Sequence, residues 1–194
     1  MKKIMIDMDD VITHGYTMKF VNDFLGTNMN LEEQTDFYLQ NLTGDRKEEF
    51  YEYISKRNLY GDCPMLDDCS RVLKQLNEEY ELYIATSYLW NSNSKNNDSS
   101  GLNLGNKYYY LKDKLPFIKP EQYIFITNKS LLNIDIKIDD RINNLTNCET
   151  KILFSNWHNR NIPKDELEEK NIIVVNSWKE IEKLLINKKQ DYSN

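Results

Sequence analysis

Short apolar runs recur along the chain, and segments with helical spacing separate most of them. Six runs are rich in β-branched and aromatic residues and nearly continuously apolar, as strands buried on both faces are. The predicted strands are Lys3–Asp7, Glu81–Thr86, Tyr123–Thr127, Ile134–Asp139, Lys151–Phe154 and Ile172–Val175. Strands that alternate with helices indicate an α/β fold with a parallel sheet.

Helical periodicity is clearest in two segments between or after these strands. Apolar residues fall at positions i, i+3, i+4 and i+7 from Cys69 to Leu76. Residues Trp178 to Leu185 follow the same spacing, although Glu182 interrupts the apolar face. This spacing predicts amphipathic helices with one buried face. Pro163, which acidic residues follow, predicts the start of another helix.

One region departs from the alternation. Residues 15–65 contain no predicted strand and are rich in tyrosine, phenylalanine and glutamate. We therefore expect a small helical cap at residues 15–65, inserted into a core domain of residues 1–14 and 66–190. The polar stretch at residues 91–100 predicts a loop, and the last five residues are expected to fray.

Composition narrows the class of protein. Of the 194 residues 40% are hydrophobic and 29% are charged, which is typical of a soluble globular protein. The net charge of -6 argues against binding a nucleic acid polymer. No apolar stretch approaches the roughly 18 residues of a membrane span, and the first apolar run is too short for a signal peptide.

The cysteines indicate a compartment rather than a site. Cys63, Cys69 and Cys148 are odd in number and form no C-x-x-C pair, so neither a disulfide framework nor a zinc cluster is indicated. We expect three reduced thiols in a cytoplasmic protein without a membrane partner. The sequence leaves open whether that protein is a monomer or a homodimer.

Polar residues stand at the ends of four predicted strands. These residues are Asp7 and Asp9, Thr86 and Ser87, Lys129, and Asp139 and Asp140. Ligands of parallel α/β sheets bind beyond the carboxyl ends of the strands, so we expect these groups to meet. Clustered carboxylates without histidine or cysteine suit Mg²⁺, and the added lysine and hydroxyl groups suit a phosphoryl group.

This set of residues predicts phosphoryl chemistry of a particular kind. The chain has no G-x-x-x-x-G-K-[ST] loop, so it is not a P-loop protein. An aspartate is able to act as the covalent nucleophile, and a second carboxylate two residues later is able to act as general acid and base.

The motifs resemble those of a known superfamily. DMDDV at residues 7–11 resembles the first motif, D-x-D-x-[TV], of the haloacid dehalogenase (HAD) superfamily. Thr86, Lys129 and the Asp139-Asp140 pair resemble its second, third and fourth motifs, in the same order. ITNKSLLNIDIKIDDR at residues 126–141 and WHNRN at residues 157–161 further resemble the 5′(3′)-deoxyribonucleotidases of that superfamily.

The resemblance implies a fold and a reaction. The fold would be a doubly wound, Rossmann-like parallel-sheet core with a small helical cap after the first strand. Asp7 would attack phosphorus and become phosphorylated, and Asp9 would protonate the leaving oxygen and then activate water. Thr86 and Ser87 would bind phosphate oxygens, while Lys129 would neutralise the charge that develops.

The resemblance also implies a cofactor and a specificity site. Mg²⁺ would be held by the Asp7 side chain, the Asp9 backbone carbonyl and Asp140, while Asp139 would orient a metal-bound water or Lys129. The position of the family's base-stacking aromatic falls near Gly15, which makes the adjacent Tyr16 a candidate substrate-binding residue. Where the family has an arginine ahead of the lysine, this chain has Thr127.

These observations predict a Mg²⁺-dependent phosphomonoester hydrolase that acts on (deoxy)nucleoside monophosphates. Two alternatives remain open at the level of sequence. One is a HAD phosphatase for another small phosphate, such as a sugar phosphate. The other is a non-catalytic nucleotide-binding or sensing module, which would have no need of Asp9. A DxD-type glycosyltransferase is remote because it has no use for Lys129.

Overall fold

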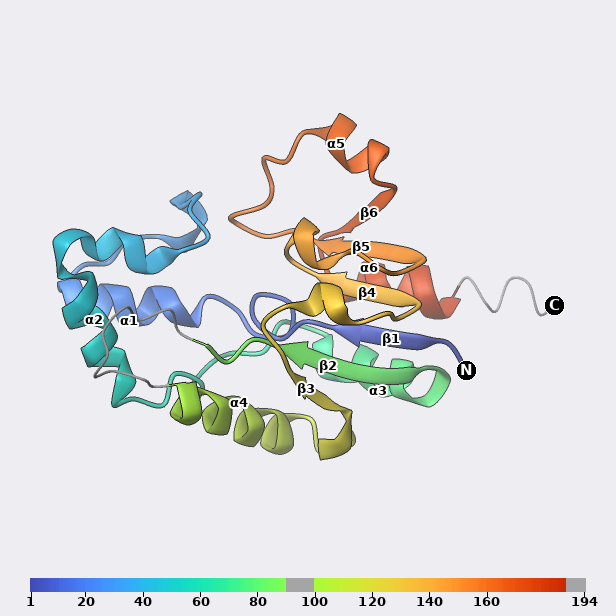
Figure 1. Ribbon diagram of the computed structural model, residues 1–194, viewed down its shortest axis with the longest axis horizontal. Helices are drawn as coiled ribbons and strands as arrows, with labels where there is room; N and C mark the ends of the chain where they lie inside the picture. The colour runs from blue at the N-terminus through green and yellow to red at the C-terminus, as the bar shows by residue number, and fades with distance from the viewer. Residues whose placement is uncertain (90–99, 188–194) are drawn as a thin grey trace.

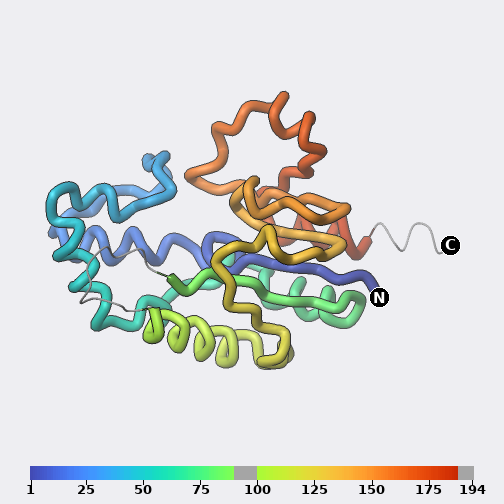
Figure 2. The backbone as a smooth tube through the Cα atoms, viewed as in Figure 1, coloured from blue at the N-terminus to red at the C-terminus, as the bar shows by residue number. Residues whose placement is uncertain are grey.

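The structure is a computed structural model that describes residues 1–89 and 100–187. The loop predicted at residues 91–100 lies outside the described residues except for Ser100, which begins a helix. The predicted frayed tail lies outside them as well. Figure 2 follows the backbone between these limits.

Within the described residues, six strands form one sheet (Figure 1). They are β1 (Lys3–Ile6), β2 (Glu81–Thr86), β3 (Tyr123–Phe125), β4 (Ile136–Asp139), β5 (Thr150–Phe154) and β6 (Ile172–Val175). Every pair is parallel and the order is β3-β2-β1-β4-β5-β6. This is the strand order of a doubly wound α/β fold, which confirms the predicted fold class.

Three strands are shorter than predicted. β1 ends at Ile6 rather than Asp7, β3 ends at Phe125 rather than Thr127, and β4 begins at Ile136 rather than Ile134. The Asp135 backbone carbonyl accepts hydrogen bonds from Glu149 and Thr150, and its carboxylate accepts one from the Lys3 amide. These bonds engage Asp135 outside the regular ladder, so β4 starts at Ile136, two residues later than predicted.

Helices lie between the strands and beyond their ends. The α-helices are α1 (Tyr16–Leu25), α2 (Lys47–Ser55), α3 (Cys69–Glu79), α4 (Ser100–Lys114), α5 (Lys164–Glu169) and α6 (Trp178–Glu182), which continues as a π-helical turn over Lys183–Asn187. Short 3₁₀ turns occupy Leu31–Glu33, Leu39–Arg46, Pro120–Gln122, Lys129–Leu131 and Ile142–Asn144. Across the described residues, each helix is too short or too polar to cross a bilayer.

The alternation of side chains along β1 divides the core into two clusters. Ile4 and Ile6 belong to the large cluster, which includes the apolar residues of α3, α4 and α6. Met5 faces the other side and packs with Ala85 and Ile134 in a small cluster. The period of two along a strand explains why neighbouring residues enter different clusters.

The insertion after the first strand is helical, as its sequence suggests. Residues 15–65 contain α1, α2 and two 3₁₀ turns, and none of the six strands of the sheet. Phe50 and Ile54 of α2 are buried, and the Phe24 and Phe50 rings meet edge-on at 5.4 Å. Figure 1 shows α1 and α2 beyond the carboxyl ends of the strands, on the side where a ligand of this fold would bind.

Candidate active site

Backbone register brings the first two carboxylates together. The Asp7 amide donates to the Ile138 carbonyl at 2.9 Å, which continues the pairing of β1 with β4 by one residue. Asp7 therefore lies beside Asp139 at the carboxyl ends of adjacent strands. The chain leaves β1 toward β2 on one side and returns to β4 on the other, so this edge is the topological switch point of the sheet.

Lys129 joins these two carboxylates. Its Nζ lies 2.6 Å from Asp7 Oδ1 and 2.8 Å from Asp139 Oδ2, and all three side chains are buried. Burial alone would lower the pKa of Lys129, but Asp139 and Asp7 together raise it above its usual range. The ammonium group therefore stays charged, and it provides the positive charge that a buried pair of carboxylates requires.

Asp7 resists ionisation in spite of this partner. Burial raises the pKa of Asp7 to about 7, while the charge of Lys129 acts in the opposite direction. The Met8 amide also donates to Asp7 Oδ1 at 2.6 Å, which fixes the orientation of the carboxylate. A further positive charge beside Asp7 would favour its ionised form.

Asp139 is engaged through both of its oxygen atoms. Oδ2 binds Lys129, and Oδ1 accepts from the Arg141 amide at 2.9 Å and from Asn144 Nδ2 at 2.8 Å. Of the two roles predicted for Asp139, this geometry favours the orientation of Lys129.

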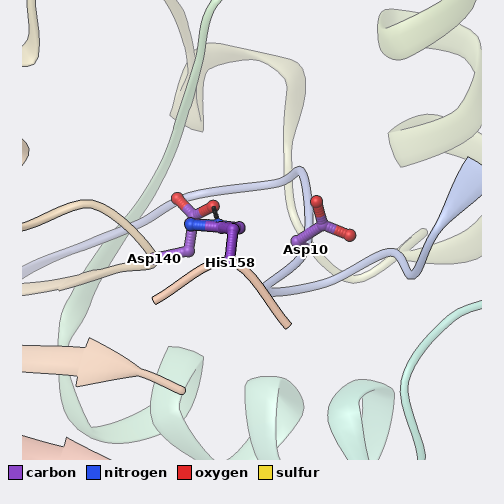
Figure 3. A group of neighbouring side chains, drawn as sticks. All are labelled: Asp10, Asp140 and His158. Atoms are coloured by element: carbon purple, nitrogen blue, oxygen red, sulfur yellow. Dashed lines mark hydrogen bonds and ion pairs between the residues drawn. The ribbon is translucent and has the colours of Figure 1, made fainter. Parts of the chain in front are cut away.

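Asp140 is held from the segment that follows β5. His158 Nε2 lies 2.7 Å from Asp140 Oδ2 (Figure 3), and Asn159 Nδ2 donates to the Asp140 carbonyl at 2.8 Å. Burial and the nearby Arg141 charge lower the pKa of His158 to about 4, so the ring is neutral near pH 7 and shares one hydrogen bond with Asp140. His158 belongs to the WHNRN stretch, and this contact fixes the Asp140 side chain.

Asp10 lies near Asp140 and His158 (Figure 3). Ligand atoms of Asp10, Asp140 and His158 all lie within 4.8 Å of one another. Asp10 Oδ1 accepts from the Gly15 amide at 3.0 Å, so this carboxylate also fixes the turn before α1. Burial raises the pKa of Asp10 to about 6.

Asp9 has two partners that the sequence analysis did not identify. Lys107 Nζ forms an ion pair with Asp9 Oδ2, and the Tyr60 hydroxyl donates to Asp9 Oδ1 at 2.6 Å. Lys107 lies on the face of α4 that also buries Asn103, Tyr110 and Leu111. A lysine is rarely fully buried unless it has a charged partner. Its place among the core-facing residues of this helix was therefore the feature of the sequence that could have indicated an ion pair.

Thr86 and Ser87 meet the site through the same lysine. Lys107 Nζ donates to Thr86 Oγ1 at 2.7 Å and to the Ser87 carbonyl at 2.5 Å. Ser87 lines the cavity described below, whereas Thr86 is buried beneath it and is not part of the wall. The resemblance implied that Thr86 binds phosphate oxygens. In the structure the Lys107 side chain contacts its hydroxyl group, and Thr86 does not line the cavity.

A cavity of about 280 Å³ opens over these groups. Its floor includes Asp7, Asp9, Lys129 and Asp140, which come from the core of the fold. Its opposite wall comes from residues 15–65 and includes Tyr16, Phe37, Tyr38 and Gln40. The predicted substrate-binding residue Tyr16 thus faces the same space as the carboxylates, and its hydroxyl lies 2.8 Å from that of Tyr60.

Three buried carboxylates provide a donor set for a metal ion. Oxygen atoms of Asp7, Asp139 and Asp140 lie within 4.8 Å of one another. Burial raises the pKa of Asp140 well above its usual range, as it does for Asp7. Donors that are all oxygen, and that repel one another without a cation, fit a hard divalent ion such as Mg²⁺.

Comparison with known proteins agrees with this chemistry. A family described as "5' nucleotidase, deoxy (Pyrimidine), cytosolic type C protein" matches residues 1–191. A 5′(3′)-deoxyribonucleotidase from Bacillus subtilis (strain 168) is 29% identical over 190 residues, which cover 96% of this chain and 100% of that protein. A putative 5′(3′)-deoxyribonucleotidase from Staphylococcus epidermidis is 27% identical over 183 residues, covering 93% of each chain.

A haloacid dehalogenase-like family hydrolase of known structure from Streptococcus pneumoniae is 13% identical and covers 93% of this chain and 96% of its own, with a TM-score of 0.45. The family match spans nearly the whole sequence and confirms the resemblance that the four motifs suggested. The chain therefore belongs to the cytosolic type C 5′ nucleotidase, deoxy (pyrimidine) family, and it is a phosphomonoester hydrolase of the nucleotidase type.

Proposed function

We propose that this protein is a Mg²⁺-dependent nucleotidase that dephosphorylates (deoxy)nucleoside monophosphates through a phosphorylated Asp7. The observation that carries the proposal is the buried ammonium of Lys129, 2.6 Å from Asp7 and 2.8 Å from Asp139 at the switch point of the sheet. A nucleophile beside a fixed cation is suited to phosphoryl transfer, where negative charge must be stabilised at the reacting group. The names of the relatives support a nucleotide as the substrate.

The metal would be held by oxygen atoms at the carboxyl ends of β1 and β4. The Asp7 and Asp140 carboxylates and the Asp9 backbone carbonyl are the proposed ligands, with Asp139 adjacent to them. When bound, Mg²⁺ would neutralise charge on the phosphoryl oxygens and favour the ionised form of Asp7. His158 and Asn159 would support the ion indirectly, because they fix the side chain and the carbonyl of Asp140.

The protein's own side chains would carry out the two steps. In the first, an Asp7 oxygen attacks phosphorus, the bond from phosphorus to the sugar oxygen breaks, and Asp9 gives its proton to that oxygen. In the second, Asp9 takes a proton from water, the water oxygen attacks phosphorus, and Asp7 leaves as a carboxylate with release of inorganic phosphate. Lys129 stabilises the charge on Asp7 and on the phosphoryl group throughout.

We further propose that residues 15–65 act as a cap that selects the leaving group. Tyr16, Phe37 and Gln40 line the cavity opposite the carboxylates. Phe37 also contacts the core, since its ring centroid lies 4.5 Å from the guanidinium carbon of Arg141 and 4.9 Å from the His158 ring. Aromatic groups at this wall suit stacking against a base, and closure of the cap would exclude water from the reaction.

A phosphate-release panel tests the substrate class. We expect Mg²⁺-dependent release from dUMP and dTMP or their 3′ isomers, and much slower release from sugar phosphates. A preference for sugar phosphates would overturn the assignment to nucleotides but not to phosphatases. Binding of nucleotides without turnover in Mg²⁺, and no effect of Asp9→Asn, would instead favour a sensing module.

A further inference from the structure

Lys107 is a buried cation that the four sequence motifs do not include. It comes from α4, and only 1% of its surface is exposed. Its ammonium group has three hydrogen atoms to donate and three acceptors around it: Asp9 Oδ2, Thr86 Oγ1 at 2.7 Å and the Ser87 carbonyl at 2.5 Å. Two of these acceptors belong to the end of β2, so that strand fixes the ammonium group, which in turn contacts Asp9.

The other oxygen of Asp9 is held from the opposite side. Tyr60 donates to Asp9 Oδ1 at 2.6 Å, and the Tyr60 and Tyr16 hydroxyl groups lie 2.8 Å apart. Tyr60 has one hydroxyl hydrogen, so once it donates to Asp9 its oxygen accepts from Tyr16. Burial keeps the pKa of both tyrosines well above the usual value, so both remain protonated donors.

These contacts restrict Asp9 without covering it. The Asp9 side chain is 29% exposed and lines the cavity beside Asp7, while Lys107 and Tyr60 occupy its two sides. A free aspartate side chain rotates about two bonds, whereas a general acid must stay within hydrogen-bonding distance of the leaving oxygen. A displacement of about 1 Å in such a group costs on the order of 100-fold in rate.

We propose that Lys107 is a positioning residue: anchored by Thr86 and Ser87, it holds the Asp9 carboxyl group toward the leaving oxygen, with Tyr60 as the second support. This inference rests on the proposed function, in which Asp9 protonates the leaving group. Thr86 and Ser87 at the end of β2 would then help to position Asp9 through Lys107, in addition to any contact with phosphate.

The test separates help to the leaving group from binding of phosphate. It compares the preferred nucleoside monophosphate with the analogue in which sulfur replaces the bridging oxygen. A thiolate leaves without a proton, so the analogue needs no general acid, while the base, sugar and phosphoryl group are the same. The value of kcat/KM is measured because it reports the steps up to cleavage of the phosphorus–oxygen or phosphorus–sulfur bond.

Lys107→Met keeps the length of the side chain and removes the charge. We expect kcat/KM for the oxygen substrate to fall about 100-fold, and for the sulfur analogue to fall at least about tenfold less. Tyr60→Phe removes one neutral hydrogen bond and should give the same selectivity with a smaller loss, about tenfold or less. Tyr110→Phe is the matched control, because the buried Tyr110 hydroxyl has no hydrogen-bond partner among residues 1–89 and 100–187, and its ring lies 5.9 Å from that of Tyr60.

Equal losses with both substrates in Lys107→Met would overturn the proposal, and weaker inhibition by inorganic phosphate would then identify Lys107 as a phosphate ligand. Unchanged activity with both substrates would overturn it as well. Asp9→Asn separates the role of Lys107 from the proposed role of Asp9 as general acid. A selective loss in Asp9→Asn without one in Lys107→Met refutes only the role of Lys107, whereas a wild-type protein that hydrolyses no monophosphate refutes the proposed function.

Discussion

At the scale of single residues, the site is an arrangement of charges that does not balance by itself. Asp7, Asp139 and Asp140 are buried together, and Lys129 is the cation that contacts two of them. His158 does not add positive charge near pH 7, because burial lowers its pKa to about 4. Burial raises the pKa of Asp7, and the nearby charges of Asp139 and Asp9 raise it further. A divalent ion suits this excess of negative charge.

Replacing the proposed nucleophile tests its role directly. Asp7→Asn keeps the shape of the side chain but removes the oxygen that would attack phosphorus, so we expect turnover to be lost. The fold should persist, because the change relieves a buried negative charge. Phosphate release and thermal unfolding check both expectations, with the exposed Asp165→Asn as the matched control. Near-normal turnover in Asp7→Asn would refute the nucleophile assignment.

Lys129 has two contributions that its removal should reveal together. Lys129→Met should reduce kcat by roughly 100-fold or more, as for the loss of one oxyanion donor. It should also lower the free energy of unfolding by about 3–5 kcal/mol, because two buried carboxylates lose their cation. Lys164→Met is the control, since that side chain is 88% exposed. A loss of activity below about tenfold would remove Lys129 from the reacting groups.

At the scale of elements, the position of a strand in the sheet decides both packing and chemistry. β4 lies between β1 and β5, and Ile138 is fully buried immediately before Asp139. β6 is at the edge of the sheet, and Ile173 and Val174 are 41% and 38% exposed. Similar apolar runs therefore have different roles: β4 supports the active site, whereas β6 forms the edge of the sheet.

A pair of isoleucine variants tests this difference. Ile138→Ala should lower the free energy of unfolding by about 2–5 kcal/mol, because it creates a cavity in the centre of the sheet. Ile173→Ala should change it by about 0.5 kcal/mol or less, as exposed substitutions do. Urea unfolding measures both variants. Similar losses in the two would show that the edge strand is covered by contacts that the structure does not describe.

At the scale of the whole molecule, the site joins segments that lie far apart in the sequence. The strand ends provide the carboxylates and Lys129, α4 provides Lys107, and residues 15–65 provide Tyr60 and the opposite wall of the cavity. Binding a cation at this junction should stabilise several elements at once, since a ligand that binds only the folded state raises stability by mass action.

The contribution of Asp7 to the stability of the metal-free protein should fall as pH rises from about 4 to about 7. The pKa of Asp7 is raised from 3.8 to about 7 in the fold, so its contribution is fully present below the unfolded value and is lost as pH rises through 7. His158 has the opposite sign, but its contribution changes between 6.5 and about 4 and is constant above that range.

Magnesium should act in the opposite direction to this loss. Its ligands must be ionised, so the stabilisation by Mg²⁺ should increase over the same pH range. Thermal unfolding in EDTA and in Mg²⁺ at several pH values measures both trends. Asp7→Asn should reduce each trend, while the raised pKa values of Asp10 and Asp140 leave a remainder, and an unreduced response of that variant would contradict the assignment.

The sequence determined the elements and the residues at their ends. Six apolar runs became the six strands, because strands of a parallel α/β sheet are rich in apolar and β-branched residues. Asp7, Thr86, Lys129 and Asp139 were recognisable because polar groups that follow such runs gather at one edge of a parallel sheet. These inferences use local patterns, which can be read directly from the sequence.

Only the tertiary structure decided which of these groups touch. Lys107 and Asp9 are 98 residues apart in the sequence, and Tyr60 and Asp9 are 51 apart. Nothing in the periodicity of α4 indicates which carboxylate its buried lysine meets, because that depends on how the helix packs against β2. The same holds for Thr86, which lies beneath Lys107 instead of on the cavity wall. Contacts of this kind follow from the packing of distant elements, which a local pattern does not specify.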